Sequence, residues 1–393
     1  MPQPTVSLIV PTFNRSKYLA SSIASLVAQT HPFDELIIVD DGSTDNTPQI
    51  VPTLPGNPIY LRKENGGRAA AINHGVRHAK GDLIWVFDDD DIALPNSLAL
   101  LIAPFLEPGS RTDFTYGPWY LCDENADGSL KVAGTSQSPL LAGPAFFHEM
   151  LFRCFTQGNA MLIARRCYDA IGPMREDLIR SQDHEYMLRL SRAFTATPIT
   201  EPIFYWRRHM GPRGAGAGKM FGVEKLNRNW HLYRQRIFVD VHRDFPLTDY
   251  LPADRRPGFP GNTREARLTR AVVMACHGLW QLAVPEMHEL VALTPQQPWT
   301  GAEQAVLDRL AGSLTTDALI DLATAGVQAD LRRLGTTRLG KSLLGQILRG
   351  GRWQIHNHLR DGERGFALAI ARSVFSTLGL WRTLGAALNR AAR

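Results

Sequence analysis

Four consecutive aspartates occupy residues 88–91, directly after an apolar run at residues 83–87 that has the character of a buried strand. Four anions at the end of such a strand repel one another, which costs free energy unless a cation or a donor-rich ligand offsets the repulsion. The pattern therefore predicts a metal and ligand site. The alternative is that these acids cap the helix after Pro95, where carboxylates are favourable, although one or two acids would be enough for a cap.

Two other polar clusters also follow predicted strands. Asp40 and Asp41 end a strand at 35–39, and an acid there could accept a hydrogen bond from a ribose hydroxyl or from N3–H of a uracil. The same residues could instead form a strand-to-helix turn in which Ser43 caps the helix. Asn65 and Arg68 flank two glycines that would let the backbone approach a diphosphate, or that could form a flexible turn before an alanine-rich helix.

Two segments further along the chain carry groups suited to proton transfer or metal binding. Asp183, in the sequence SQDHE, could act as a general base toward a sugar hydroxyl, or the segment could be a capping box that begins a surface helix at Ser181. His209, in the sequence YWRRH, could ligate a metal, but a lone histidine after a strand is more often an ordinary surface or core residue.

The elements that would position these residues alternate along the first part of the chain. Apolar runs predict strands at 5–10, 35–39, 59–61 and 83–87, and helical spacing predicts helices at 17–29, 44–51 and 68–79. Such alternation implies crossover connections and a parallel, doubly wound α/β sheet. Ligands bind such sheets outside the carboxyl ends of the strands, and the polar clusters fall there. Further elements are expected at 114–121, 130–132 and 203–206 (strands) and at 146–155 and 183–193 (helices).

Composition limits the class of protein. The chain has 393 residues, 44% of them hydrophobic and 21% charged, so it can build a sizeable core and is expected to have two domains or one domain with an appendage. We expect neither a membrane span nor a signal peptide, because no apolar run of about 18 residues occurs and residues 1–15 lack a signal pattern. Four widely spaced cysteines argue against a zinc site or disulfide framework and favour a cytoplasmic location.

The C-terminal region is predicted to be helical and basic, after a glycine-rich loop or hinge at 211–218 and a linker at 251–262. Residues 332–393 contain twelve Lys or Arg and two acids, which indicates an anionic partner. Apolar spacing predicts an amphipathic helix within 366–393. This helix could lie on the inner face of a membrane, near a lipid-linked acceptor, or it could pack on residues 263–334 and serve in a homo-oligomer.

Taken in order, six segments resemble those of the inverting family 2 nucleotide-sugar glycosyltransferases, which have the GT-A fold. They are VSLIVPTFNR, ELIIVDDGSTDNT, NGGRAAAINHG, GDLIWVFDDDD, SQDHEYMLRL and FYWRRH, and they cover about residues 5–210. The resemblance implies a GT-A domain at 1–222, with a Rossmann-like, mostly parallel doubly wound sheet. Residues 223–393 are then a mainly α-helical C-terminal region.

The resemblance also implies roles for particular residues. Asp90, in a D-x-D motif, would hold Mn²⁺ or Mg²⁺, and His209 would complete the metal site. Asp183 would be the catalytic base, with Gly158, Asn159 and Gln182 on the acceptor side. Whether Arg207 or Arg208 faces the diphosphate is left open. The nucleoside and phosphates would lie among Pro11, Thr12, Phe13, Arg15, Asp41, Asn65, Arg68, Asp88, Asp89 and Arg207.

The expected activity is an inverting, metal-dependent transfer of one sugar per encounter, because the Q-x-x-R-W motif and membrane helices of processive synthases are absent from the expected places. The resemblance favours a UDP-sugar donor and a hydroxyl acceptor in polysaccharide or glycoconjugate synthesis. A non-catalytic nucleotide-sugar-binding or scaffold protein is one alternative. A nucleotidyltransferase is another, but it would need a glycine-rich loop with a lysine near the first strand. No motif indicates nucleic-acid binding.

Overall fold

The computed structural model describes residues 3–208, 223–293 and 296–379. The chain divides into two compact units, Met1–Leu226 and Asn227–Arg393. The predicted glycine-rich loop at 211–218, His209 and the end of the predicted C-terminal helix beyond residue 379 lie outside the described residues.

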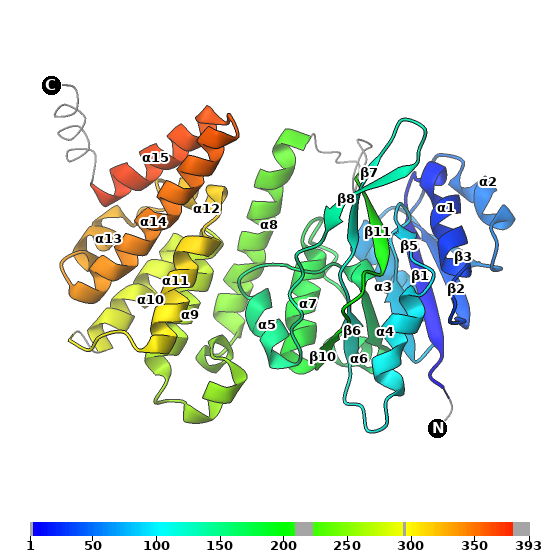
Figure 1. The fold of residues 1–393 in the computed structure, drawn as a ribbon, viewed down its shortest axis with the longest axis horizontal. Coiled ribbons are helices and arrows are strands. Elements are labelled where there is room, and N and C mark those ends of the chain that lie inside the picture. The colour runs from blue at the N-terminus through cyan, green and yellow to red at the C-terminus, as the bar shows by residue number, and fades with distance from the viewer. Residues whose placement is uncertain (1–2, 209–222, 294–295, 380–393) are drawn as a thin grey trace. The chain divides into compact units, whose positions relative to one another are not determined.

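The first unit is built on a seven-stranded sheet with the order β10-β6-β9-β4-β1-β2-β3 (Figure 1). The four strands predicted from apolar runs are confirmed: β1 (Val6–Thr12), β2 (Glu35–Asp40), β3 (Ile59–Arg62) and β4 (Leu83–Val86), all parallel. They form because β1, β2 and β4 are buried almost throughout, as apolar strands of a parallel sheet must be. Thr12 pairs with Asp40, so the polar ends of β1 and β2 lie side by side.

Helices connect these strands and fix the residues that follow them. They are α1 (Ser16–Val27), α2 (Thr47–Ile50) with the 3-10 turn Val51–Thr53, α3 (Arg68–His78) and α4 (Ser97–Leu106). Gly75 lets α3 pack closely on the sheet, because a Cβ there would lie only 2.5 Å from the side chain of Ile9. This packing holds Arg68, the first residue of α3, at the edge where the strands end.

The remaining strands of the central sheet depart from a purely parallel order. β9 (Met161–Ala164) runs antiparallel between β4 and β6 (Phe114–Tyr116), and β10 (Ala196–Pro198) pairs parallel with β6 at the edge. The single strand predicted at 114–121 is wrong. The chain leaves β6 at Gly117-Pro118, where proline has no N–H to donate, and continues as β7 (Tyr120–Glu124) in a second sheet.

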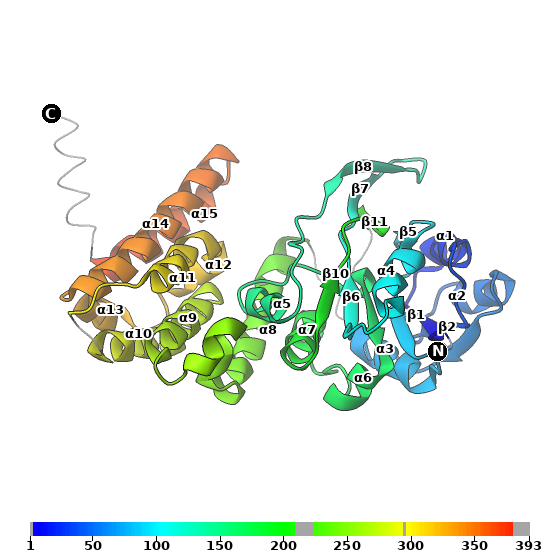
Figure 2. The ribbon, with the colours of Figure 1, turned by 60° about the horizontal axis from the view of Figure 1, so that its bottom comes forward.

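The second sheet has four strands in the order β5-β11-β7-β8, where β5 is Ile92–Ala93, β11 is Phe204–Arg208 and β8 is Leu130–Thr135. β7 and β8 pair antiparallel as a hairpin, which projects from the unit (Figures 1 and 2). Because β5 follows the four aspartates directly, its pairing with β11 brings Arg207 beside them. The other helices of this unit are α5 (Pro144–Met150), the 3-10 turn Gly158–Ala160, α6 (Arg165–Ile171) and α7 (Gln182–Ala193).

The second unit contains only helices among its described residues (Figure 1). Trp280 is fully buried in its core, and its Nε1 donates to the carbonyl oxygen of Ala318 at 2.7 Å. The helices are α8 (Val223–Asp244), which begins in the first unit, α9 (Thr263–Cys276), α10 (Trp280–Leu293), α11 (Gly301–Ser313), α12 (Thr316–Asp321), α13 (Gln328–Leu334), α14 (Arg338–Arg360) and α15 (Arg364–Leu378), with 3-10 turns at Leu247–Tyr250 and Ala253–Gly258.

The described part of the predicted amphipathic C-terminal helix is α15. Its apolar residues Ile370 and Val374 are buried in the second unit, and Ser373 Oγ donates to the carbonyl oxygen of Leu319 at 2.6 Å. Ile370, Ser373 and Val374 therefore pack inside the second unit, as expected if this helix packs on residues 263–334. Within the described ranges, no helix has both the length and the apolar character needed to cross a bilayer.

Candidate active site

The segment after β1 is tied to the turn after β2 by Asn14. The side-chain oxygen of Asn14 accepts from the backbone N–H groups of Thr44 (2.7 Å) and Asp45 (3.2 Å). The backbone N–H of Asn14 donates to Ser43 Oγ at 2.9 Å. Asn14 has φ 52°, a left-handed conformation that asparagine tolerates better than most residues. Ser43 therefore anchors the 11–15 segment, and the alternative in which Ser43 caps the helix is wrong.

The two aspartates after β2 have different tasks. Asp40 is fully buried and accepts from the backbone N–H of Ser43 (2.7 Å) and from the hydroxyl of Tyr60 (2.5 Å), so it supports the turn. The carboxylate of Asp41 accepts from Lys63 Nζ (2.8 Å) and from the N–H groups of Gly66 (3.0 Å) and Gly67 (2.7 Å). Gly67 has φ 90°, which favours glycine, so Asp41 orders the glycine turn that precedes α3.

The four aspartates at 88–91 meet two arginines from neighbouring elements. Arg15 forms an ion pair with Asp90, and Arg68 donates to one oxygen of Asp88 from Nε (3.1 Å) and Nη2 (2.6 Å). Asp89 is buried, and its Oδ2 has no hydrogen-bond partner among the described residues. Burial, together with the negative charge of Asp90, raises the pKa of Asp89 to about 8.

Asp91 links two strands and a turn rather than capping α4. Its Oδ2 accepts from Asn159 Nδ2 at 2.6 Å, and its Oδ1 accepts from the backbone N–H of Arg207 at 2.9 Å. The carbonyl oxygen of Asn159 in turn accepts from Trp85 Nε1 on β4 at 2.9 Å. Asp91 is therefore the buried link between the ends of β4 and β11 and the 158–160 turn.

Of the two neighbouring arginines on β11, Arg207 faces the four aspartates at 88–91, here called the acidic turn. Its side chain is 6% exposed, and it donates to the carbonyl oxygen of Asp90 (2.9 Å) and to Glu124 Oε1 (3.1 Å). Arg208 points to the surface and pairs with Asp123 at 2.7 Å.

Glu124, at the end of β7, also belongs to this group and was not predicted from the sequence. It also accepts from the hydroxyl of Tyr18 at 3.2 Å. Burial by itself would raise the pKa of Glu124, but the bonds from Tyr18 and Arg207 lower it below its usual value. Glu124 lies in a stretch that resembles a polar turn, and only the pairing of β7 with β11 places it near Arg207.

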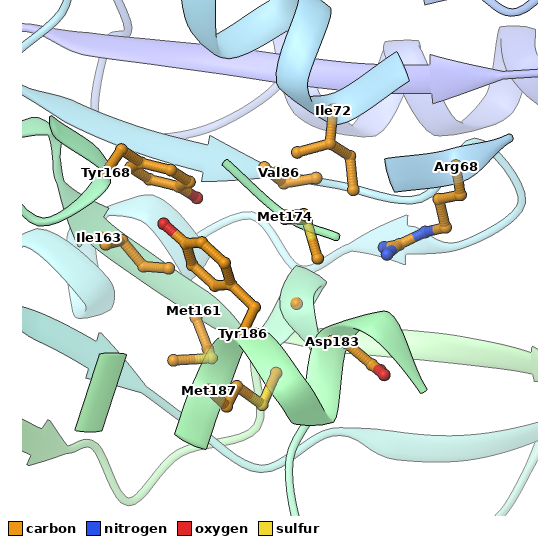
Figure 3. Close-up of a pocket in the computed structure, with 11 residues that line it drawn as sticks. Arg68, Ile72, Val86, Met161, Ile163, Tyr168, Met174, Asp183, Tyr186 and Met187 are labelled. Carbon is orange, nitrogen blue, oxygen red and sulfur yellow. The ribbon is translucent and has the colours of Figure 1, made fainter. Parts of the chain in front are cut away.

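Asp183 lies in the first turn of α7, beside a pocket whose other walls are mostly apolar (Figure 3). Its Oδ1 accepts from the backbone N–H of His184 at 2.9 Å. In Figure 3, Asp183 and Arg68 lie on one side of the pocket, and the stacked rings of Tyr168 and Tyr186 lie on the other. The pocket is also lined by Ile72, Val86, Gly158, Met161, Ile163, Met174 and Met187.

The capping box considered for this segment is not formed. Ser181 has φ 58° and makes no side-chain cap bond, while Glu185 bonds Arg189 at 2.7 Å on the same helix. Gln182 and His184 are buried, and His184 Nε2 lies 2.8 Å from the carbonyl oxygen of Met150. A left-handed conformation at a residue other than glycine, next to a pocket, is typical of functional segments.

Arg68 connects the acidic turn to Asp183. Burial would lower its pKa, but the charges of Asp88, Asp183 and Asp90 more than offset this and raise it. Gly158 lies against the same guanidinium, since a Cβ there would be 3.6 Å from Arg68 Nη2. Arg68 thus lies between the acidic turn and Asp183, which are about a hundred residues apart in the sequence.

The structure brings most of the predicted site residues to one edge of the sheet. Thr12 and Pro11 are buried at the end of β1, and Phe13 is half-buried. Asn65 Nδ2 donates to the carbonyl oxygen of Asp41 at 3.0 Å, which places it in the glycine turn. His209, the further metal ligand predicted from the sequence, lies outside the described residues.

A family model supports the interpretation of this arrangement. Residues 7–140 match the model described as Glycosyl transferase family 2, and this range includes β1 to β8 and all four aspartates. These residues therefore form a domain of this family. The predicted family, the enzyme class and the fold class, a mostly parallel GT-A sheet followed by helices, are confirmed.

Relatives of this glycosyltransferase are similar over part of their length. An uncharacterized glycosyltransferase of Rickettsia felis is 29% identical over 191 residues, which is 48% of this chain and 32% of that protein. The hyaluronan synthase of Pasteurella multocida is 31% identical over 255 residues, 63% of this chain and 25% of the synthase. The chain therefore spans about a third or less of these two proteins. A crystal structure of TarS from S. aureus has a TM-score of 0.48 and 16% identity, covering 83% of this chain and 53% of that one.

The acidic turn of the glycosyltransferase has the chemistry of a divalent cation site. Carboxylate oxygens of Asp88, Asp90 and Asp91 lie within 4.8 Å of one another. Oδ2 of the buried Asp89 beside them has no hydrogen-bond partner among the described residues, and burial, together with the charge of Asp90, raises the pKa of this carboxyl. Oxygen ligands of this kind suit Mg²⁺ and Mn²⁺, so the residues fit the predicted metal.

Asp91→Ala is expected to destabilise the glycosyltransferase by roughly 2–4 kcal/mol, because it leaves the buried Asn159 amide and the Arg207 N–H without their acceptor. Chemical denaturation measures this change in the free energy of unfolding. Asp123→Ala removes a carboxylate that pairs with Arg208 on the surface and should cost about 0.5 kcal/mol or less. Equal losses in the two variants would contradict the structural role of Asp91.

Proposed function

We propose that the glycosyltransferase moves one sugar from a nucleoside-diphosphate sugar, with UDP favoured, to a hydroxyl acceptor, and inverts the anomeric centre. The observation that carries this proposal is the position of Arg68. It bonds Asp88 in the acidic turn and lies across the pocket edge from Asp183 (Figure 3). A cation for a leaving diphosphate and a carboxylate for a proton are thus available at one place.

The donor would lie along the carboxyl ends of β1, β2 and β4. Pro11, Thr12, Phe13, Asp41 and Asn65 are proposed to surround the nucleoside; Asp41 has oxygens that can accept from a base or a ribose, although they bond Lys63 and two glycines in this structure. Asp88 and Asp89 would then approach the ribose. Arg15 and Arg68 supply fixed positive charge for the phosphates, with Arg207 behind the acidic turn.

Mn²⁺ or Mg²⁺ is proposed to bind at Asp90, with His209 as a further ligand. When bound, such an ion offsets negative charge on the departing diphosphate. Asp90 lies next to Arg15. The charges of Asp90 and Asp89 raise the pKa of Arg15, although burial alone would lower it. The arginine holds the acidic turn in place and adds a second positive charge near the phosphates.

Asp183 is proposed to remove the proton from the acceptor hydroxyl. The acceptor oxygen forms a bond to the anomeric carbon while the bond from that carbon to the diphosphate oxygen breaks, and the nucleoside diphosphate leaves with the bonding electrons. Attack from the opposite face inverts the centre. Gly158, Asn159 and Gln182 would shape the acceptor side, because the 158–160 turn and the start of α7 border Arg68 and Asp183.

The similarity to a hyaluronan synthase fits a role in polysaccharide or glycoconjugate synthesis. A cytoplasmic location with peripheral membrane contact and a homo-oligomer both stay predictions. For contact through 366–393, the side chains of Ile370 and Val374 are already buried, so other residues would have to meet the lipid.

Calorimetry of the full chain with UDP, GDP and dTDP, each with and without Mn²⁺, tests the donor assignment. We expect UDP to bind tightest and its affinity to rise at least tenfold with Mn²⁺, since an ion held at Asp90 would offset the negative charge of the diphosphate. Absence of binding by all three nucleotides would overturn the proposed function, and preference for GDP or dTDP would correct the choice of UDP.

A further inference from the structure

Helix α14 exposes one stripe along its whole length. Its opposite stripe is buried in the second unit and contains Leu339, Leu343, Ile347 and Gly350. The exposed residues recur every three or four positions, so they lie on one face of the helix. From Lys341 onward they are Lys341, Gly345, Arg349, Arg352, Trp353, His356, Leu359 and Arg360, here called the α14 stripe.

The charge of the α14 stripe has one sign. It contains Lys341, Arg349, Arg352 and Arg360, and α14 contains no Asp or Glu. Among the described residues, the first three of these cations have no ion-pair partner, whereas Arg360 pairs with Asp361 at 3.0 Å. Uncompensated cations on one helix face are typical of surfaces that meet an anionic partner.

Two large apolar side chains lie among these cations. Trp353 and Leu359 are each 54% exposed, so much of their apolar surface faces water. Tryptophan is suited to the boundary between water and lipid because its ring is apolar and its N–H is polar. A soluble anionic polymer would use the cations but offers no apolar medium for Leu359, so cations and apolar groups on one face favour a bilayer.

We propose that the α14 stripe is the surface through which the chain docks on a bilayer that contains anionic lipids. The helix lies along the membrane surface, its cations meet the lipid phosphates, and Trp353 and Leu359 enter the interface. This is a different surface from the buried apolar residues Ile370 and Val374 of α15. It does not depend on which sugar or nucleotide the first unit uses.

Vesicle flotation of the full chain tests the proposal directly. One set of vesicles contains phosphatidylcholine and phosphatidylglycerol, and the other contains phosphatidylcholine alone. The main variant is Lys341→Glu/Arg349→Glu/Arg352→Glu. Its matched control reverses three exposed cations of the first unit, Arg77→Glu/Arg111→Glu/Lys131→Glu, and so changes the net charge equally. A third variant, Trp353→Ala, keeps every charge.

Each basic residue close to an anionic surface contributes about fivefold in affinity. We therefore expect the stripe variant to bind anionic vesicles at least a hundredfold more weakly than the native chain, and the control variant within about threefold of it. Trp353→Ala should weaken binding about tenfold, and this loss should persist at high salt because it concerns apolar contact. Thermal unfolding checks that the variants are folded.

Several outcomes would overturn the proposal. They are absence of flotation by the native chain, equal losses in the stripe and control variants, and unchanged binding by Trp353→Ala. Retention of the native chain on immobilised heparin without flotation, lost in the stripe variant, would assign the stripe to an anionic polymer instead of a membrane.

Discussion

Asp183→Asn is expected to lower kcat by about two orders of magnitude or more while the affinity for the donor nucleotide stays within about threefold of the native value. Asparagine has the size of aspartate and can still accept from the N–H of His184, so the start of α7 should keep its conformation. It cannot take a proton from the acceptor hydroxyl. Initial rates at saturating donor and acceptor measure kcat, and calorimetry measures nucleotide binding.

Asp177→Asn is the matched control for this variant. Asp177 lies a few residues before α7 and pairs with Arg175 on the surface, away from the residues that line the pocket. It should leave kcat and nucleotide binding near their native values. Near-native turnover by Asp183→Asn would remove Asp183 from the role of base, and a matching loss of nucleotide binding would indicate instead that Asp183 holds the donor.

Asp90→Asn is expected to abolish the dependence of activity on Mn²⁺ and to lower kcat/KM by two orders of magnitude or more, in line with the several kcal/mol that a metal ion contributes to such transition states. The substitution removes the carboxylate charge that pairs with Arg15 and contributes to the cluster of three acids. Titration of activity with Mn²⁺ after treatment with a chelator gives the measurement.

Asp169→Asn, on the exposed face of α6, serves as the control and should titrate like the native chain. Full activity of the native chain in excess chelator would contradict the metal site, whatever Asp90→Asn does. A native-like Mn²⁺ titration of Asp90→Asn would show that the ion binds elsewhere.

The sequence predicted the parts of the first unit that local chemistry decides. β1, β2 and β4 are continuous apolar runs, which few structures other than buried parallel strands can accommodate, and polar residues follow each of them. The grouping of Arg15, Arg68 and the aspartates followed from the rule that such strands end at one edge. The second task of Asp91, as a buried link between strands, needed the structure.

The parts that the sequence did not predict depend on long-range pairing. β9 is antiparallel inside an otherwise parallel sheet, and no local pattern distinguishes such a strand. Glu124 reaches Arg207 only because β7 pairs with β11, some eighty residues further along the chain. A helical C-terminal region was predicted, but the bounds of α14 were not. Glycines lower helix propensity, yet Gly350 and Gly351 lie on the buried face of α14, where Ala311 and Val374 approach closely.

Proton NMR of a single reaction mixture tests whether the transfer inverts the anomeric centre and depends on Asp183. A donor with an α-linked sugar, an acceptor alcohol and Mn²⁺ are followed with the native chain and with Asp183→Asn. We expect a β-linked product and free nucleoside diphosphate in equal amounts, formed about a hundredfold more slowly by the variant. An α-linked product, or release of pyrophosphate in place of nucleoside diphosphate, would contradict it.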